Sequence, residues 1–313
     1  MSATAVSLVL PALVLAACAP CLHAAQRSAK SPWTVAGHIA PEQFVIQSHR
    51  GAGELAPENT LEAFELGWSL GTIPEADLRT TSDGVIVAFH DADFARVVRD
   101  LPPQLRDKGV KDVTWEQLAQ LDVGAWKGDE FVGRRVSRIA DVFALLPEHP
   151  QRRLYLDIKN VQLPQLAREV MEHGVERQVI LASTKYDIIR EWKRLVPQSQ
   201  TLHWMGGSEE QLSRRLDELR KNGFADITQL QLHIHRKNDE PIGRDSIDPF
   251  TLSDAFIIET GKELRSHGIL FQTLPYGGMT KEVYWKLLDL GVMSFATAHP
   301  KVTLEAVREY TDR

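Results

Sequence analysis

Two histidines and two acidic residues lie within one short part of the chain, and their side chains could do chemistry together. The runs are His49-Arg50-Gly51, Glu75-Ala76-Asp77 and His90-Asp91, and the outer two lie about forty residues apart. Two imidazoles can divide acid and base work, and two carboxylates can hold a divalent cation between them. These residues therefore form a candidate catalytic site, and the remaining elements must position it.

Strand-like and helix-like patterns alternate from Trp33 to the end of the chain. Nine strands are predicted, at Phe44–Ser48, Pro74–Arg79, Val85–Phe89, Arg153–Ile158, Gln178–Ala182, Thr201–Met205, Ile227–Ile234, Ile269–Leu274 and Val292–Thr297. The helical patterns include Thr60–Leu70, Leu163–His173, Tyr186–Leu195, Ser208–Asn222, Asp254–His267 and Lys281–Leu290. Such alternation is typical of an α/β protein.

One strong turn signal changes the strand count. Asp83-Gly84 predicts a tight reversal, so Val85–Phe89 should fold back as a hairpin on Pro74–Arg79. Eight parallel strands then remain, and eight strands with intervening helices in about 260 residues predict a TIM (β/α)8 barrel. A doubly wound open sheet is the alternative, but no Gly-rich phosphate loop follows the first strand.

A barrel would bring the candidate residues to one place, because catalytic groups stand at the C-terminal ends of its strands. His49 follows the first strand, and Asp157 and Lys159 lie at the end of a later one. Glu75 and Asp77 are two residues apart, so they share a face at a spacing of roughly 6–7 Å. Two inward acids are costly without a partner. Salt bridges are the alternative to a metal.

The hairpin should return His90 to the mouth of the barrel, beside the acidic pair. Two histidines that both end strands are better explained as an acid–base pair than as isolated surface residues. Asp91 either orients His90 or caps the next turn, and the sequence slightly favours the cap.

The chain outside these elements holds two further segments. Residues 1–25 are expected to be a signal peptide or lipoprotein signal: Val6–Ala17 is apolar, and Leu15-Ala16-Ala17-Cys18 resembles a lipidation site. Cleavage near Ala19 or Ala25 is the alternative, and Met1–Ala5 lacks the usual basic residue. We therefore expect an exported protein, periplasmic or membrane-tethered through Cys18. Residues 33–313 should form one domain, with an insertion at about 92–136.

The composition limits the classes of binding partner and metal site that are expected. The net charge is −6 and the pI is near 6.0, so no general positive field would recruit nucleic acid. Cys18 and Cys21 are the only cysteines, so the mature domain would have no disulfide and no thiolate metal site. A small-molecule substrate is expected, and no protein partner is evident.

Some polar residues on the predicted strands have two possible roles. Gln229, Gln231 and Gln272 could bind a polyol head group or one another. His233 and His235 could bind zinc, but no third ligand is evident, so the sequence does not favour a metal site there.

An ordered series of short motifs resembles the glycerophosphodiester phosphodiesterase family, within the phospholipase-C-like phosphodiesterase superfamily. The motifs are His49-Arg50-Gly51, Pro57-Glu58-Asn59-Thr60, Ala63-Phe64, Gly71, Glu75-x-Asp77, Thr80, Asp83-Gly84, His90-Asp91 and Leu156-Asp157-Ile158-Lys159. The insertion lies where the family has a small cap. The resemblance covers nearly the whole mature chain and is densest between residues 47 and 91.

The resemblance implies a TIM barrel that hydrolyses phosphodiesters with a divalent cation, calcium or magnesium. Glu75, Asp77 and Asp157 would hold the metal, and His49 and His90 would be the acid–base pair. Arg50 and Lys159 would contact the phosphate, Glu58 would lie near the metal and histidines, and Asp91 would lie beside His90. In the family the attacking group is thought to be the neighbouring glycerol hydroxyl, and the sequence does not distinguish it from water.

Three motifs depart from the family pattern. Asp157 replaces the usual Glu, Phe271-Gln272-Thr273-Leu274 replaces a Trp-Thr-Val-Asn run, and Thr297-Ala298-His299-Pro300 replaces Thr-Asp-x-Pro. These changes affect which substrate is expected more than they affect the expected type of reaction. The expected product is a phosphomonoester of the glycerol 3-phosphate type and an alcohol. The alternatives are an exported phosphodiesterase for a sugar or polyol phosphodiester, and a catalytically silent binding lipoprotein.

Overall fold

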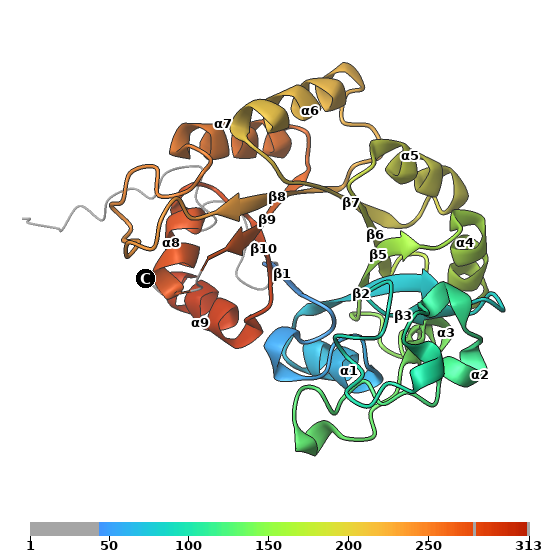
Figure 1. Cartoon of the computed structure of the whole chain (residues 1–313). Coiled ribbons are helices and arrows are strands. Elements are labelled where there is room, and N and C mark those ends of the chain that lie inside the picture. The colour runs from blue at the N-terminus through green and yellow to red at the C-terminus, as the bar shows by residue number, and fades with distance from the viewer. Residues whose placement is uncertain (1–43, 278–279, 312–313) are drawn as a thin grey trace, which may run out of the picture. The chain divides into compact units, whose positions relative to one another are not determined.

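The computed structural model describes residues 44–277 and 280–311. Its centre is a closed ring of parallel strands, which confirms the predicted TIM barrel (Figure 1). The ring consists of β1 (Val45–Ser48), β2 (Ile73–Thr80), β5 (Leu154–Asn160), β6 (Val179–Ser183), β7 (Gln200–Met205), β8 (Gln229–His235), β9 (Leu270–Tyr276) and β10 (Ser294–Thr297). It closes because β1 pairs in parallel with both β10 and β2.

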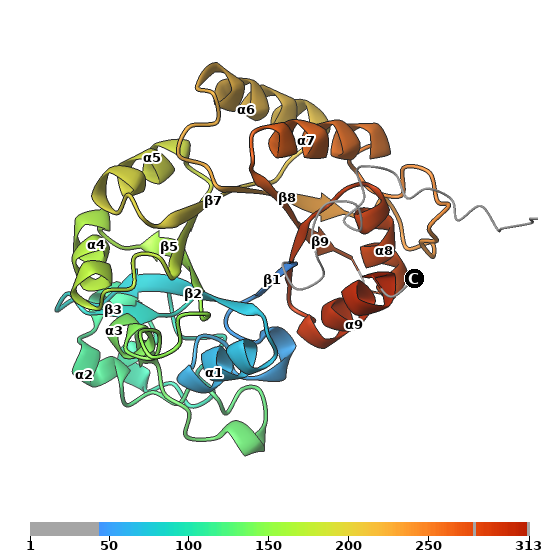
Figure 2. The same ribbon diagram turned by 180° about the vertical axis from the view of Figure 1, so that it is seen from behind.

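Helices surround the ring on its outer side, as the views from both ends show (Figures 1 and 2). They are α1 (Leu61–Ser69), α3 (Ile139–Phe143), α4 (Leu163–Glu172), α5 (Tyr186–Leu195), α6 (Glu209–Lys221), α7 (Asp254–Ser266), α8 (Lys281–Asp289) and α9 (Pro300–Thr311). Their apolar faces pack on the strands around fully buried Phe64, Trp192 and Phe271. Burial of this continuous apolar layer is the main stabilising term of the fold.

The hairpin predicted at Asp83-Gly84 is present. β3 (Ile86–Ala88) runs antiparallel to β2, and Leu78 lies opposite Ala88. The sequence missed β4 (Ser137–Arg138), which pairs antiparallel with β3 and returns the chain to the barrel. The hairpin brings residue 90 back to the level of Asp77, since the Phe89 amide donates to the Asp77 carbonyl at 2.7 Å.

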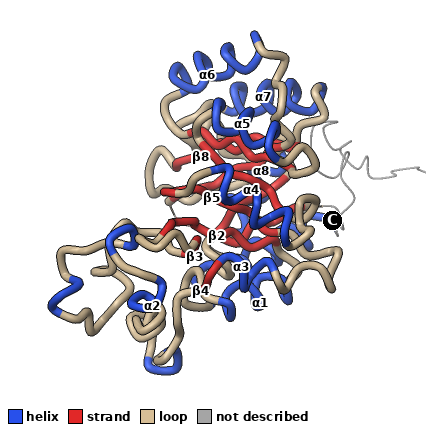
Figure 3. The backbone as a smooth tube through the Cα atoms, turned by 90° about the vertical axis from the view of Figure 1, so that its right-hand side faces the viewer, coloured by secondary structure: helices blue, strands red, loops and turns tan. Residues whose placement is uncertain are grey.

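The insertion at about 92–136 has a small apolar cluster of its own. Phe94, Val98, Leu105 and Leu118 are buried together there, and α2 (Trp115–Leu118) is its short helix. Figure 3 shows this segment beside β3 and β4, at the edge of the barrel. Its core makes the insertion an ordered lobe, which can hold polar residues against the site.

The expected export segment, with Cys18, lies outside the described residues. Within residues 44–277 and 280–311, no helix is both long and apolar enough to cross a bilayer.

Candidate active site

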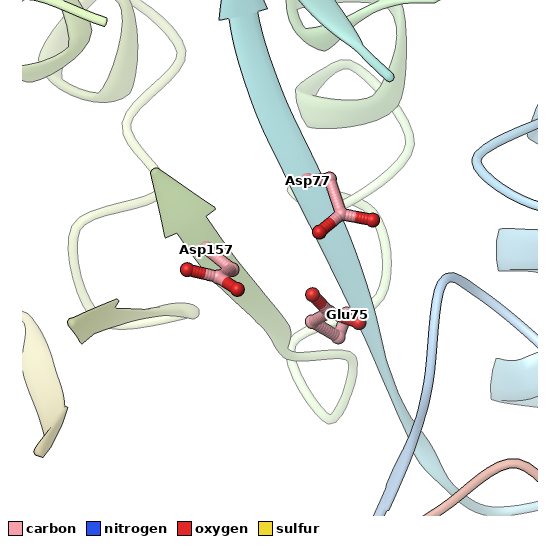
Figure 4. A group of neighbouring side chains, drawn as sticks. All are labelled: Glu75, Asp77 and Asp157. Carbon is pink, nitrogen blue, oxygen red and sulfur yellow. The ribbon is translucent and has the colours of Figure 1, made fainter. Parts of the chain in front are cut away.

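Three carboxylates converge at the mouth of the barrel. Glu75 and Asp77 point inward from β2, and Asp157 points inward from β5, where it lies in register with Asp77. One oxygen from each lies within 4.8 Å of the others. Figure 4 shows the three side chains turned toward the space between the two strands. The i, i+2 spacing on β2 and the parallel register of β5 together produce this cluster.

The pKa values of the three carboxyl groups are shifted in different directions. Burial raises the pKa of Glu75 well above its usual range, and the negative charges of Asp77 and Asp157 raise it further. Burial also raises the pKa of Asp157, against the effect of Lys159. For Asp77, burial is outweighed by Lys159 and other donors, so its pKa is lowered. Crowded buried carboxylates of this kind gain from a shared cation.

Lys159 is the positive charge inside the cluster. Its ammonium nitrogen lies 2.6 Å from Asp157 Oδ2 and 3.1 Å from Asp77 Oδ1. Burial disfavours the charged amine, but the surrounding carboxylates outweigh it and raise the pKa of Lys159. Lys159 therefore stays protonated beside the acids.

Arg50 connects the acids to the turn after β1. It has a left-handed backbone (φ 53°), and its amide donates to Glu75 Oε2 at 2.8 Å. Its Nη1 donates to both oxygens of Glu58, at 3.0 and 3.1 Å. Asn59 is also left-handed (φ 58°); its Nδ2 donates to Asp77 Oδ2, and its Oδ1 accepts the Asp77 backbone amide. Asn59 belongs to the motif Pro57-Glu58-Asn59-Thr60, but no role was predicted for it from the sequence.

Two buried atoms in this cluster lack a hydrogen-bond partner among the described residues. Asp77 Oδ1 receives no hydrogen bond, although Lys159 Nζ lies 3.1 Å away, and Arg50 Nε donates none, although Asp77 Oδ2 lies 3.7 Å away. An unpaired buried acceptor or donor is costly, so such atoms mark places where a ligand is expected. The oxygen set of Glu75, Asp77 and Asp157 fits a hard divalent cation. Arg50 Nε fits a phosphate oxygen.

Both histidines line one cavity of about 290 Å³ with Arg50, Glu75 and Asp157. His49 stands at the end of β1, where its amide donates to the Thr297 carbonyl at 2.9 Å. Burial, followed by the charge of Arg50, lowers the pKa of His49 to about 4. His49 is therefore a neutral imidazole near pH 7, able to accept a proton.

His90 is held by a chain of charged side chains that reaches into the insertion. His90 Nδ1 lies 2.6 Å from Asp91 Oδ1, and Arg96 Nε donates to Asp91 Oδ2 at 2.6 Å. Arg96 also binds both oxygens of Glu58 and lies under the Trp126 ring. The slight preference for Asp91 as a turn cap was wrong, because its side chain binds His90 and Arg96. The sequence missed Arg96, whose only signal is a charged residue five positions after Asp91.

On the other side of the barrel interior, around β8 and β9, buried polar side chains form hydrogen bonds with one another. Gln231 and Gln272 bind each other, and Gln272 Nε2 also donates to Ser294 Oγ at 2.9 Å. The Tyr155 hydroxyl donates to Gln229 Oε1 at 2.6 Å. Of the two roles left open for these glutamines, mutual hydrogen bonding is therefore present for Gln231 and Gln272, whereas Gln229 binds Tyr155 and Gln200.

The remaining residues singled out in the sequence lie around this cavity. His233 stacks on Trp204, with ring centres 4.7 Å apart, and His235 stacks on Tyr276. The described histidines 233 and 235 belong to no three-ligand metal cluster. Of the altered run at 271–274, Phe271 is buried against the helices and Leu274 lines the cavity. At the other altered motif, His299 pairs with Glu54 at 2.6 Å.

Comparison with known proteins agrees with this architecture. The model of the glycerophosphoryl diester phosphodiesterase family matches residues 49–302. A glycerophosphodiester phosphodiesterase of Caldanaerobacter subterraneus subsp. tengcongensis is 30% identical over 160 residues, which cover 49% of this chain and 63% of that protein. The match therefore spans less than two thirds of that relative. A glycerophosphodiester phosphodiesterase of Bacillus subtilis is 22% identical over 290 residues, covering 87% and 89%.

Solved structures show the same fold. A putative glycerophosphoryl diester phosphodiesterase from Silicibacter pomeroyi aligns with a TM-score of 0.66 at 21% identity, over 85% of this chain and 93% of that one. A phosphodiesterase from Oleispira antarctica, solved with sn-glycerol-3-phosphate, aligns with a TM-score of 0.62 at 19% identity, over 84% and 96%. With the family match across most of its length, this chain belongs to the glycerophosphoryl diester phosphodiesterase family.

Proposed function

We propose that the protein is a metal-dependent phosphoric diester hydrolase that cleaves glycerophosphodiesters to an alcohol and a phosphomonoester of the glycerol 3-phosphate type. The observation that carries the proposal is the convergence of Glu75, Asp77 and Asp157 beside two histidines in one cavity. Family membership supports the same reaction.

The proposed cofactor is Ca²⁺ or Mg²⁺, held by Glu75, Asp77 and Asp157, because carboxylate oxygens suit these ions better than zinc. When bound, the ion would neutralise phosphate oxygens and make the attacking hydroxyl more acidic. Arg50 and Lys159 would bind the phosphate and orient it. The Nε of Arg50, which donates no hydrogen bond within the described residues, supports its part in this arrangement.

His49 is proposed as the base. Its lowered pKa keeps the ring neutral near pH 7, so it can take the proton of the attacking hydroxyl, either the neighbouring glycerol hydroxyl or water. His90 is proposed as the acid. Asp91 engages its Nδ1, which leaves Nε2 as the nitrogen that donates to the leaving alkoxide.

We also propose that the protein is exported, as a periplasmic protein or as a lipoprotein tethered through Cys18. The support is the apolar segment at Val6–Ala17 and the lipobox-like run that ends at Cys18. Metabolic labelling with a palmitate analogue, compared between the natural chain and Cys18→Ala, tests the tether. Labelling that persists in the variant would refute it.

The activity is tested on purified protein with glycerophosphocholine and bis(p-nitrophenyl) phosphate, with Ca²⁺, Mg²⁺ or a chelator. We expect turnover with one of these ions, loss with the chelator, and a fall of about 10²–10⁴-fold in His49→Ala and in His90→Ala. Full activity in both variants would refute the acid–base assignment. Tight binding without turnover of any diester would favour a silent binding protein.

A further inference from the structure

A second cavity, of about 420 Å³, opens beside the site and shares part of its wall. Asp157, Lys159 and Trp204 line both cavities. The second cavity is also lined by Ser183, the last residue of β6, by Thr184 and Lys185 after it, and by Arg79. A phosphodiester centred on the three acids therefore has room for one of its two halves here. We call this space the β5–β6 cavity.

The β5–β6 cavity is lined by the cations Arg79 and Lys185, and the charges of Asp77, Asp91 and Asp93 act on Arg79 without forming an ion pair. Among the described residues, no carboxylate forms an ion pair with Lys185 or Arg79. The Lys185 side chain does not cap α5, and the Arg79 guanidinium donates to the backbone carbonyl of His90 at 2.8 and 3.0 Å. Lys159, by contrast, is bound to Asp77 and Asp157.

A third cavity of about 310 Å³ lies between the barrel and the insertion. This outer cavity shares Arg79 and Asn160 with the β5–β6 cavity. The charged insertion residues that line it are Arg106, Lys108 and Lys111, and Asp93, Asp107 and Asp112.

The acids and bases of the outer cavity are engaged differently. Asp93 accepts the Ala95 amide and Asp112 accepts the Gly109 amide, both at 3.0 Å, so these carboxylates are used within their own turns. Within the described part of the chain, Arg106, Lys108 and Lys111 form no ion pair. The carboxylates keep their negative charge in these hydrogen bonds, and Asp107 also lines the outer cavity, so this cavity carries charges of both signs.

Building on the proposed function, we propose that the β5–β6 cavity binds the alcohol half of the substrate, and that the preferred alcohol is a polyol with additional negative charge, such as a further phosphate. Lysine and arginine side chains recognise phosphate through charge-assisted hydrogen bonds. The hydroxyls of Ser183 and Thr184 and the amide of Asn160 suit a polyol. A quaternary ammonium alcohol such as choline would instead face Arg79 and Lys185.

Three glycerophosphodiesters that differ in the charge of the alcohol test this specificity. They are glycerophosphocholine, glycerophosphoglycerol and glycerophosphoinositol 4-phosphate, assayed on the full chain with Ca²⁺ or Mg²⁺ at fixed ionic strength. We expect kcat/KM to be highest for the anionic polyol, at least about tenfold above glycerophosphocholine, and the preference to shrink as salt is added. Equal values, or a preference for choline, would overturn the inference.

The variant Lys185→Ala assigns the effect to the cavity. It should raise KM for the anionic substrate at least fivefold and leave kcat/KM for glycerophosphocholine within twofold. Lys221→Ala, at an exposed lysine of α6 that lines neither cavity, is the matched control.

The outcomes separate this inference from the proposed function. If Lys185→Ala lowers kcat/KM for all three substrates equally, the cavity does not select the alcohol and the inference is wrong, while the hydrolase activity stands. If the natural chain hydrolyses none of them and also fails on bis(p-nitrophenyl) phosphate, the proposed function is refuted and this inference falls with it.

Discussion

The two sides of the barrel interior both contain buried polar side chains, and they differ in how far the hydrogen bonds of these side chains are completed within the protein. On the β8–β9 side, Gln231 and Gln272 bind each other, Gln272 also binds Tyr155 and Ser294, and Gln229 binds Tyr155 and Gln200. On the β2–β5 side, Asp77 Oδ1 and Arg50 Nε are buried without a hydrogen-bond partner in the described part of the chain.

This difference separates a structural polar network from a functional one. A buried polar group costs little when its hydrogen bonds are complete, and it then fixes the packing around it. A group left open lowers stability until a ligand completes it. The β2–β5 side is therefore the side that needs a cation and a phosphate, and substitutions on the two sides should affect different properties.

The largest expected effect is on the β2–β5 side. Asp77→Asn keeps the shape of the side chain but removes a charge from the proposed metal site. We expect kcat/KM to fall by about 10³-fold or more, because a metal ion contributes several kcal/mol to the transition state. Steady-state assays over a range of Ca²⁺ and Mg²⁺ concentrations measure the loss.

The matched control for this change is Asp141→Asn on α3, where an exposed aspartate pairs with Arg138. Its activity should stay within twofold of the natural chain. If Asp77→Asn keeps more than a tenth of the activity at every metal concentration, Asp77 is not a metal ligand.

A smaller effect is expected from the insertion, which supports the β2–β5 side from outside the barrel. Arg96→Ala removes the side chain that joins Asp91 to Glu58, so His90 loses its fixed orientation. We expect kcat to fall about 10-fold to 100-fold with little change in KM, since proton transfer depends on that orientation.

A pH–rate profile tests whether Arg96 acts through His90. The limb that belongs to the general acid should move in Arg96→Ala, and Arg96→Lys should restore part of kcat. Arg99→Ala, which removes an exposed pair with Asp129, should change neither. A loss that appears only in KM would contradict the positioning role.

The sequence predicted the strands, helices and barrel topology better than the contacts between side chains. Alternating periodicity and the Asp83-Gly84 turn are local signals, so the barrel and the hairpin were both found. β4 (Ser137–Arg138) was missed because two residues cannot show alternation. Its pairing with β3 depends on contacts between segments about fifty residues apart.

The same limit explains what was missed in the site. Glu75 and Asp77 share a face by strand geometry alone, so their proximity could be inferred. The clamp of Arg96 on Glu58 joins residues 38 positions apart across the insertion, and no pattern in either segment indicates it. Whether the glutamines would bind a ligand or one another depended on the stagger of β8 and β9, which sets their register.

On the β8–β9 side, a substitution should affect stability more than activity. Gln272→Leu removes hydrogen bonds to Gln231, Tyr155 and Ser294 and leaves their groups buried without a partner. We expect the free energy of unfolding to fall by about 1–3 kcal/mol, measured by urea titration, with kcat/KM within threefold. Gln120→Leu, at an exposed glutamine, is the control. A large loss of activity without loss of stability would make this network part of the substrate site.

The smallest expected effect concerns the metal-free protein. The raised pKa of Glu75 means that the folded chain holds a proton that the unfolded chain releases above about pH 4.5. Stability is therefore lost as the pH rises from that value through the folded pKa, because the folded state binds more protons. Glu75→Gln removes this penalty, so without metal at pH 8 it should be more stable than the natural chain by about 1 kcal/mol, or about 2 °C in Tm.

Two comparisons by thermal unfolding make this result specific. At pH 5 the advantage of Glu75→Gln should shrink, because Glu75 is then protonated in the natural chain as well. With Ca²⁺ or Mg²⁺ at pH 8 the order should reverse, since an ion that binds only the folded state raises its stability by RT ln(1 + [L]/Kd) and the variant lacks one ligand. If metal raises the Tm of both proteins equally, Glu75 is not a ligand of the proposed metal site.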